Sequence, residues 1–261
     1  MKCDNTLKHS SKLKLFLRFL PTIIAVILLS VMVPAESMGQ MFSVGEKEPQ
    51  FNSPNTNFFL GVEAMDVSYQ GLRSIDNSAG QFEFAGPIIK VGYRNQFVNL
   101  HLSTGGPVSG IEYVGYFEVG GALNVLIDLY QSETISLFLP IHISSRLVNM
   151  TNSKNFYPRF NNFRFGNLSG GLGPKVLIRP AEKIRIDVRG IPTYGFAFAS
   201  RGSQGGSFGS VDLQGRLYFD RLFGDVGLSV GYQYDLRNYD IDEDVYDYKI
   251  KGHIFELGIT F

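Results

Sequence analysis

Serine, histidine and aspartate residues are spaced so that they could meet in a hydrolytic site. His101, Ser103 and His142 share the polar parity near the ends of two alternating segments, and Asp212 begins a third segment on the same side. A serine nucleophile, a histidine base and an orienting carboxylate are the parts of a common covalent mechanism. A histidine on a polar wall more often serves only as a hydrogen-bonding group. We therefore expect no enzyme and treat this set as the catalytic alternative.

A second candidate site is a run of aromatic and arginine residues between positions 155 and 165. Aromatic rings stack on sugars and arginine pairs with phosphate, so these residue types suit glycan or lipopolysaccharide binding where a loop exposes them. The alternative is that the rings extend an aromatic girdle or fold over the mouth of the structure. The predicted binding residues are Phe156, Tyr157, Arg159, Phe163 and Arg164.

Composition argues against several other kinds of site. The chain has 24 basic and 24 acidic residues, which is not the basic excess typical of nucleic-acid binding. We therefore expect no nucleic-acid partner. The acidic run at 240–244 looks like a calcium loop, but Val245 and Lys251 stand where an EF-hand has glycine and glutamate. We expect no metal site and no cofactor.

The candidate residues must be positioned by strands, because apolar and polar residues alternate along much of the chain. Leu123, Val125, Ile127 and Leu129 show this period of two clearly. No stretch after residue 40 approaches 18 consecutive apolar residues, so membrane-spanning helices are not expected. The alternating segments lie at about 57–69, 83–94, 96–104, 111–130, 134–146, 165–178, 183–198, 209–220, 225–236 and 248–261.

The links between these segments alternate in length. Short links near 94–96, 131–133, 179–182 and 220–224 alternate with mostly longer ones at 70–82, 105–110, 147–164, 199–208 and 237–247. The sequence therefore predicts an all-β fold, a transmembrane antiparallel up-and-down β-barrel of about ten strands, within a range of roughly 8–12. Its apolar face should contact lipid, because aromatic residues gather near the segment ends. Asp66 and Ile250 fall on the wrong faces, and we expect them beyond the membrane or at bulges.

Charged residues of both signs fall on the inward face of this barrel. Charges moved from water into so narrow a space are costly unless they are paired. We expect an internal salt-bridge network that fills the lumen, with a narrow polar conduit as the alternative. The inward charged residues are Glu63, Lys90, Arg94, Glu112, Glu118, Asp128, Lys175, Arg185, Asp187, Arg189, Asp212, Arg216, Asp220, Asp235 and Glu256.

The last residues carry a family resemblance. Phe255, Leu257, Ile259 and Phe261 share one parity, and the sequence stops on the aromatic residue. This resembles the closing strand of bacterial outer-membrane β-barrel proteins, in which such a terminal Phe is the signal read by the barrel-assembly machinery. The resemblance implies an integral protein of the outer membrane of a diderm bacterium, in contact with its lipid and lipopolysaccharide, with both termini periplasmic.

The first residues look like a secretory signal peptide. A lysine-rich start is followed by an apolar run from about Leu20 to Pro34, and Ser37 and Gly39 supply the small residues of a cleavage site. Cleavage would remove Cys3, so no disulfide is expected. The expected organisation is a signal peptide at 1–39, a short periplasmic segment at 40–56 and the barrel at 57–261.

The leading expectation for function is a non-enzymatic structural or surface-interaction role. Outer loops would contact glycan, lipopolysaccharide or a protein partner. A narrow channel or small-solute transporter is the first alternative, and an outer-membrane hydrolase is the second. The close Asp-Asp and Asp-His pairs of ten-stranded outer-membrane proteases are absent from the sequence.

Overall fold

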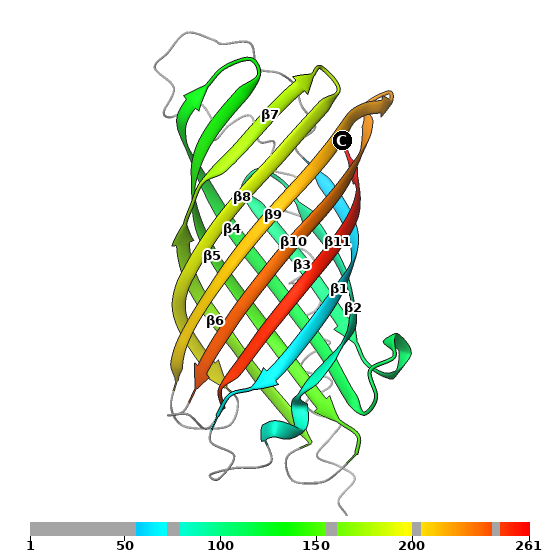
Figure 1. Ribbon diagram of the computed structural model, residues 1–261, viewed down its shortest axis with the longest axis vertical. Helices are drawn as coiled ribbons and strands as arrows, with labels where there is room; N and C mark the ends of the chain where they lie inside the picture. Colours follow the sequence, from blue (N-terminus) through cyan, green and yellow to red (C-terminus); the bar gives the residue numbers. More distant parts are fainter. Residues whose placement is uncertain (1–55, 72–78, 155–160, 200–204, 242–245) are drawn as a thin grey trace, which may run out of the picture. The chain divides into compact units, whose positions relative to one another are not determined.

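The barrel is a single antiparallel sheet that closes on itself (Figure 1). The computed structural model describes residues 56–71, 79–154, 161–199, 205–241 and 246–261. Closure comes from β1 (Asn57–Tyr69) and β11 (Tyr248–Thr260), which pair without interruption along their full length. The predicted all-β barrel is confirmed. The predicted signal peptide and residues 40–55 lie outside the described residues.

The described wall consists of ten crossings. Between β5 and β8, strands β6 and β7 form one crossing that is interrupted at Gly173 and Pro174, where the proline has no N–H to donate to the ladder. Among the described residues, no helix is long and apolar enough to cross a membrane. The remaining elements are β2 (Phe84–Arg94), β3 (Val98–Gly105), β4 (Val114–Gln131), β5 (Ile135–Asn152), β6 (Asn162–Leu172), β7 (Lys175–Ala181), β8 (Ile184–Ala199), β9 (Gly206–Phe223), β10 (Val226–Ile241), η3 (Ala79–Phe82) and η4 (Pro107–Ser109).

The two ends of the barrel differ in their connections. Tight turns join β2 to β3, β4 to β5, β7 to β8 and β9 to β10, and they lie at the same end as the C-terminus; we call this the hairpin end. The longer connections lie at the opposite end, which we call the loop end. Several predicted loops there are too long, because β5 continues to Asn152, β6 begins at Asn162 and β10 continues to Ile241.

Through the hairpin end and the middle of the barrel, apolar side chains point outward. Phe58, Leu60 and Val62 of β1 are 50–58% exposed, whereas the side chain of Glu63, the next residue along the strand, is fully buried. An exposed apolar belt around a closed antiparallel sheet is the architecture of bacterial outer-membrane proteins, because closure satisfies every backbone group in lipid. The prediction of an outer-membrane barrel is confirmed.

Toward the loop end the inward face of the strands becomes apolar and the outward face becomes polar. Alternate side chains still point inward and outward as before. Met65 and Val67 of β1 point inward and are buried, whereas Asp66 between them is exposed. Ile250 of β11 also points inward, and the β1–β11 register has no bulge there. The expected bulge is therefore wrong, and the alternative that these residues lie beyond the membrane fits. An apolar interior with a polar exterior is typical of a barrel surrounded by water.

The interior at the loop end is filled by an apolar cluster, which we call the apolar plug. Its rings stack on one another, as Phe163 does on Phe82 and Phe165 at centroid distances of 6.0 and 5.2 Å. The plug consists of Met65, Val67, Tyr69, Phe82, Ile88, Ile111, Val114, Tyr116, Val148, Met150, Phe163, Phe165, Ala197, Phe208, Tyr239, Ile241, Tyr248 and Ile250.

Candidate functional site

A fully buried arginine lies next to the apolar plug, on the side that faces the middle of the barrel. Arg237 of β10 places Nη1 2.6 Å from Glu118 Oε2, Nη2 3.3 Å from Glu63 Oε1 and Nε 3.0 Å from Asp235 Oδ2. All four side chains have no exposed surface. Because Asp235 and Arg237 are two residues apart on one strand, both point inward. The guanidinium therefore joins β10 to β1 and β4 across the lumen.

Further polar contacts extend this cluster to neighbouring strands. Arg146 Nη1 of β5 lies 2.5 Å from Asp235 Oδ2, and the Tyr116 hydroxyl donates to Glu118 Oε2 at 2.5 Å. His101 Nε2 of β3 lies 2.9 Å from Glu118 Oε1. Lys90 Nζ of β2 is 3.9 Å from Glu63. We call these residues, with Arg237, Glu63, Glu118 and Asp235, the central network.

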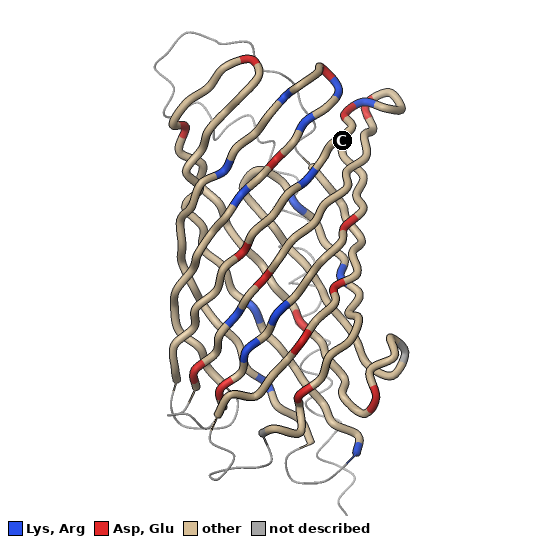
Figure 2. Tube along the Cα trace, viewed as in Figure 1, with Lys and Arg blue, Asp and Glu red and all other residues tan. Residues whose placement is uncertain are grey.

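A second group of charged residues lies toward the hairpin end. Arg94 and Arg216 both contact Glu256 Oε2 at 3.2 Å, and Arg216 also donates to the Tyr218 hydroxyl at 3.2 Å. Separate ion pairs join Lys175 to Asp187 at 3.1 Å, Arg185 to Asp220 at 3.1 Å and Arg189 to Asp212 at 3.6 Å. Acidic and basic residues are interleaved on neighbouring strands and are not separated into two sides (Figure 2). The mixed internal network expected from the sequence is present.

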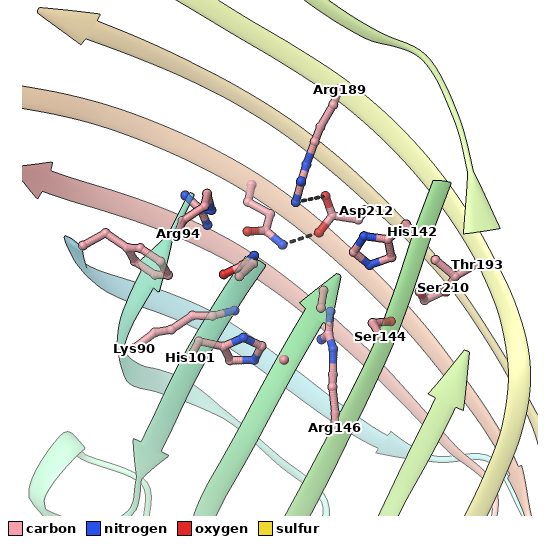
Figure 3. Close-up of a pocket in the computed structure, with 15 residues that line it drawn as sticks. Lys90, Arg94, His101, His142, Ser144, Arg146, Arg189, Thr193, Ser210 and Asp212 are labelled. Atoms are coloured by element: carbon pink, nitrogen blue, oxygen red, sulfur yellow. Dashed lines mark hydrogen bonds and ion pairs between the residues drawn. The ribbon is translucent and has the colours of Figure 1, made fainter. Parts of the chain in front are cut away.

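A small cavity lies between these two groups of charges (Figure 3). Its volume is about 30 Å³, which leaves room for only a few water molecules. The residues that line it are polar except for Phe59, Gly121 and Ala122; the polar ones are Lys90, Arg94, Asn99, His101, His142, Ser144, Arg146, Arg189, Thr193, Ser210, Asp212 and Gln233.

The cavity brings together only part of the predicted catalytic set. His101, His142 and Asp212 line it, but Ser103 is buried on β3 beside Lys90 and Glu118 and is not among the lining residues. The expectation that these residues sit at a rim is wrong. His101 and His142 lie in the middle of the lumen, because β5 continues ten residues beyond His142.

The hydrogen bonds of these residues lead to groups other than a serine. His142 Nδ1 lies 2.7 Å from Asn124 Oδ1, and His101 contacts Glu118. Asp212 accepts a hydrogen bond from Gln233 and pairs with Arg189. A nucleophile needs a base within hydrogen-bond reach, and the structure gives these histidines other partners.

The chain also holds a Gly-x-Ser-x-Gly sequence at Gly205–Gly209, which was not among the candidates above. In hydrolases this sequence forms a sharp turn between a strand and a helix. Here it runs straight into β9, and the Ser207 hydroxyl donates to Asp240 Oδ2 at 3.4 Å on the exposed face. The local structure therefore lacks the turn that would present Ser207 as a nucleophile.

The predicted aromatic–arginine site divides into three parts. Phe156, Tyr157 and Arg159 lie outside the described residues. Phe163 was expected on an exposed loop, but it belongs to β6 and is fully buried in the apolar plug. Arg164 is exposed, and its Nε lies 3.3 Å from Asn149 Oδ1. The position predicted for Phe163 is wrong, because β6 already begins at Asn162 and its parity turns the Phe163 side chain inward.

The predicted list of inward charges needs four changes. Glu112 and Asp128 are exposed: Glu112 precedes β4, and Asp128 lies at an irregularity of register near the β4–β5 turn. Arg146 and Arg237 were missed, although both are central to the network. Each lay at or just beyond the end of a predicted segment, and continuing the parity from Asp235 by one step would have found Arg237.

Comparison with known proteins gives structural similarity at low identity. No family model and no curated protein sequence matches the chain. It resembles the outer membrane protease OmpT from Escherichia coli at 9% identity and a TM-score of 0.43, over 84% of this chain and 100% of that one. It also resembles Ail of Yersinia pestis in complex with the heparin analogue sucrose octasulfate (12%, TM-score 0.29, 80% and 99% of the two chains). A third is the translocator domain of the autotransporter NalP from Neisseria meningitidis (8%, TM-score 0.38, 79% and 88%). Identities this low transfer none of these proteins' roles to the chain.

Proposed function

We propose that the protein is a closed, non-enzymatic barrel that presents its loop end at the cell surface as an interaction platform. In this arrangement the hairpin end and both termini are periplasmic, since outer-membrane barrels have short periplasmic turns and longer extracellular loops. The alternation of tight turns and longer connections in this chain supports that orientation.

The observation that carries this proposal is the filling of the lumen. At the loop end the apolar plug packs rings from several strands, including Phe163, Phe208, Tyr239 and Tyr248, all at most 2% exposed. Next to the plug, toward the middle of the barrel, Arg237 and its three carboxylates connect strands across the lumen. The lumen of an open porin is polar and filled with water, whereas this lumen has an apolar layer and ion pairs without exposed surface. These two layers support a scaffold over a channel.

The outward face of β11 supports a contact with the outer leaflet. Phe255 is 64% exposed in the apolar belt, and the next outward positions toward the loop end are His253, Lys251 and Lys249. Lipopolysaccharide carries phosphate groups at this boundary, and lysine binds phosphate as a point charge. We propose that Lys249 and Lys251 contact lipopolysaccharide phosphate, while Arg164, together with the residues 155–160 that lie outside the described part of the chain, meets glycan or a protein partner.

Conductance measurements on the reconstituted protein test the closed lumen. We expect no stable conductance in planar bilayers, because the plug and the central network block the path. Steady openings on the order of a nanosiemens in the unmodified protein would overturn the proposal in favour of a channel or transporter. A 16-stranded porin in the same bilayers serves as the positive control.

Retention of lipopolysaccharide on the purified barrel tests the surface role. The double variant Lys249→Ala/Lys251→Ala should retain several-fold less lipopolysaccharide, as read by native mass spectrometry. Lys183→Ala, which removes an exposed lysine at the hairpin end, is the matched control and should retain the normal amount. Equal retention by the unmodified protein, the double variant and the control would contradict the proposed contact with lipopolysaccharide phosphate.

A further inference from the structure

The buried charges of the lumen do not balance. Among the described residues, the ion pairs between the apolar plug and the hairpin end join eight cationic and seven anionic inward side chains, and Arg179, which donates to Ser136 near the hairpin end, adds one more cation. The cations of these ion pairs are Lys90, Arg94, Arg146, Lys175, Arg185, Arg189, Arg216 and Arg237, and the anions are Glu63, Glu118, Asp187, Asp212, Asp220, Asp235 and Glu256.

The surplus positive charge can be placed in the structure. The central network holds three cations, Lys90, Arg146 and Arg237, against three carboxylates. The Lys175, Arg185 and Arg189 pairs each have one carboxylate. What is left is Arg94 and Arg216, which share Glu256. One guanidinium of this pair therefore has no negative charge of its own.

Neutral groups compensate this charge only in part. The Arg94 guanidinium stacks on the Phe59 ring at 4.4 Å, and Arg216 donates to the Tyr218 hydroxyl. The side chains of Arg94 and Arg216 are only 8% and 3% exposed, so bulk water does not solvate them. A buried charge without a counter-charge is costly, and structures avoid it by pairing.

The cavity lies beside this surplus charge. Arg94 lines it together with Lys90, Arg146 and Arg189, whereas Asp212 is the only carboxylate among the lining residues (Figure 3). Among the lining residues, the donors Arg94 Nε and Arg189 Nε are buried without a hydrogen-bond partner in the protein, and so are the acceptors Asn99 Oδ1 and Asp212 Oδ1. Four cations, two unused N–H donors and one carboxylate describe a space that favours an anion.

We propose that this cavity binds one small monovalent anion, with chloride as the physiological occupant. The cavity volume of about 30 Å³ admits a halide with a few waters and excludes phosphate esters, sugars and larger organic acids. An anion beside Arg94 compensates the surplus positive charge of the lumen and accepts hydrogen bonds from unused N–H groups. The ion is then a structural component that ties β2 to the opposite wall of the lumen.

Thermal unfolding in salts of different anions tests this site in the intact, detergent-solubilised barrel. At constant ionic strength, replacing sodium gluconate by sodium chloride should raise the apparent midpoint by about 2–4 °C and then saturate, because gluconate is too large to enter. The variant Arg94→Gln removes the surplus charge and should lose this dependence. The control Arg185→Gln alters a balanced pair away from the cavity and should keep it.

Crystals of the unmodified protein grown with bromide give a test that needs no variant. We expect an anomalous peak inside the cavity, within contact distance of Arg94. Equal midpoints of the unmodified protein in chloride and gluconate would overturn the proposal. So would bromide peaks confined to the protein surface, which would show an adventitious ion only.

Discussion

Arg237 Nη1 lies 2.6 Å from Glu118 Oε2, and neither side chain has any exposed surface. The two residues belong to β10 and β4, which are not neighbours in the sheet, so the pair spans the lumen. Such a pair contributes little net stability compared with apolar packing, but it is costly to break, because removing one partner leaves a buried charge. It therefore fixes how opposite walls of the barrel face each other.

Removal of this guanidinium should destabilise the barrel strongly. Arg237→Met leaves Glu63, Glu118 and Asp235 without their shared cation, and we expect a loss of about 3–5 kcal/mol in the free energy of unfolding. Urea unfolding in detergent, followed by the heat-dependent shift on electrophoresis, measures it. The double variant Arg237→Met/Glu118→Gln should be less destabilised than the single variant, because one unpaired charge is gone. A neutral effect of Arg237→Met would contradict the buried network.

Strand parity could be predicted from the sequence, because each face keeps its side chains wherever the register is unbroken. Leu123, Val125 and Ile127 showed the lipid face, and Glu63 and Glu256 showed the lumen. The ends of the alternating segments also predicted the positions of the tight turns. These are local properties, and a period of two makes them visible without any knowledge of partners.

The apolar plug could not be predicted, because it depends on where the membrane ends along each strand. Val67 and Ile250 obey the same parity as Glu63 and Glu256, yet Asp66 and Ile250 looked misplaced while the lumen was assumed to be polar throughout. Because of that assumption, the predicted segments that correspond to β5 and β10 end too early. Arg146 and Arg237 were therefore missed. Which histidine meets which acid depends on the stagger between strands, which the sequence does not show.

The assigned faces predict opposite effects for neighbouring residues on β4. Val125 is 59% exposed on the apolar belt, so Val125→Arg should cost about 2–4 kcal/mol near the middle of the bilayer. Asn124 is 7% exposed and points inward, so Asn124→Ala should be milder and should disturb only the contact with His142. The fraction of folded barrel in outer membranes, measured by heat modifiability, distinguishes the two. Equal assembly of both variants would mean that Val125 does not face lipid.

Substitutions of the neighbouring residues Phe163 and Arg164 should also have unequal effects on stability. Phe163 lies in the apolar plug, whereas Arg164 lies on the outer face. Phe163→Ala leaves a cavity among Phe82, Phe165 and Tyr246, and we expect a loss of about 3–5 kcal/mol in unfolding free energy. Arg164→Ala should change stability by less than about 0.5 kcal/mol. If both substitutions were equally mild, Phe163 would behave as an exposed loop residue.

The proposed orientation can be tested by cysteine labelling, because the only native cysteine, Cys3, lies in the predicted signal peptide. Ser153→Cys lies at the loop end and Glu133→Cys in the β4–β5 turn at the hairpin end, and both positions are exposed. A membrane-impermeant maleimide should label Ser153→Cys in intact cells and should label Glu133→Cys only after the outer membrane is opened. The reverse pattern would place the hairpin end outside.

The aromatic residue that follows β11 should be needed for assembly. The Phe261 ring stacks on Phe58 at 5.6 Å, and its backbone exchanges hydrogen bonds with Thr56 beside the seam between β1 and β11. Phe261→Asp removes the ring at this seam and places a charge at the edge of the belt, so the protein should accumulate unfolded in the periplasm or be degraded. Phe223→Asp is the control, because Phe223 is 72% exposed at the same end of the barrel but lies away from the seam. Folded, heat-modifiable Phe261→Asp protein at normal levels in the outer membrane would show that the closing strand does not act as the assembly signal.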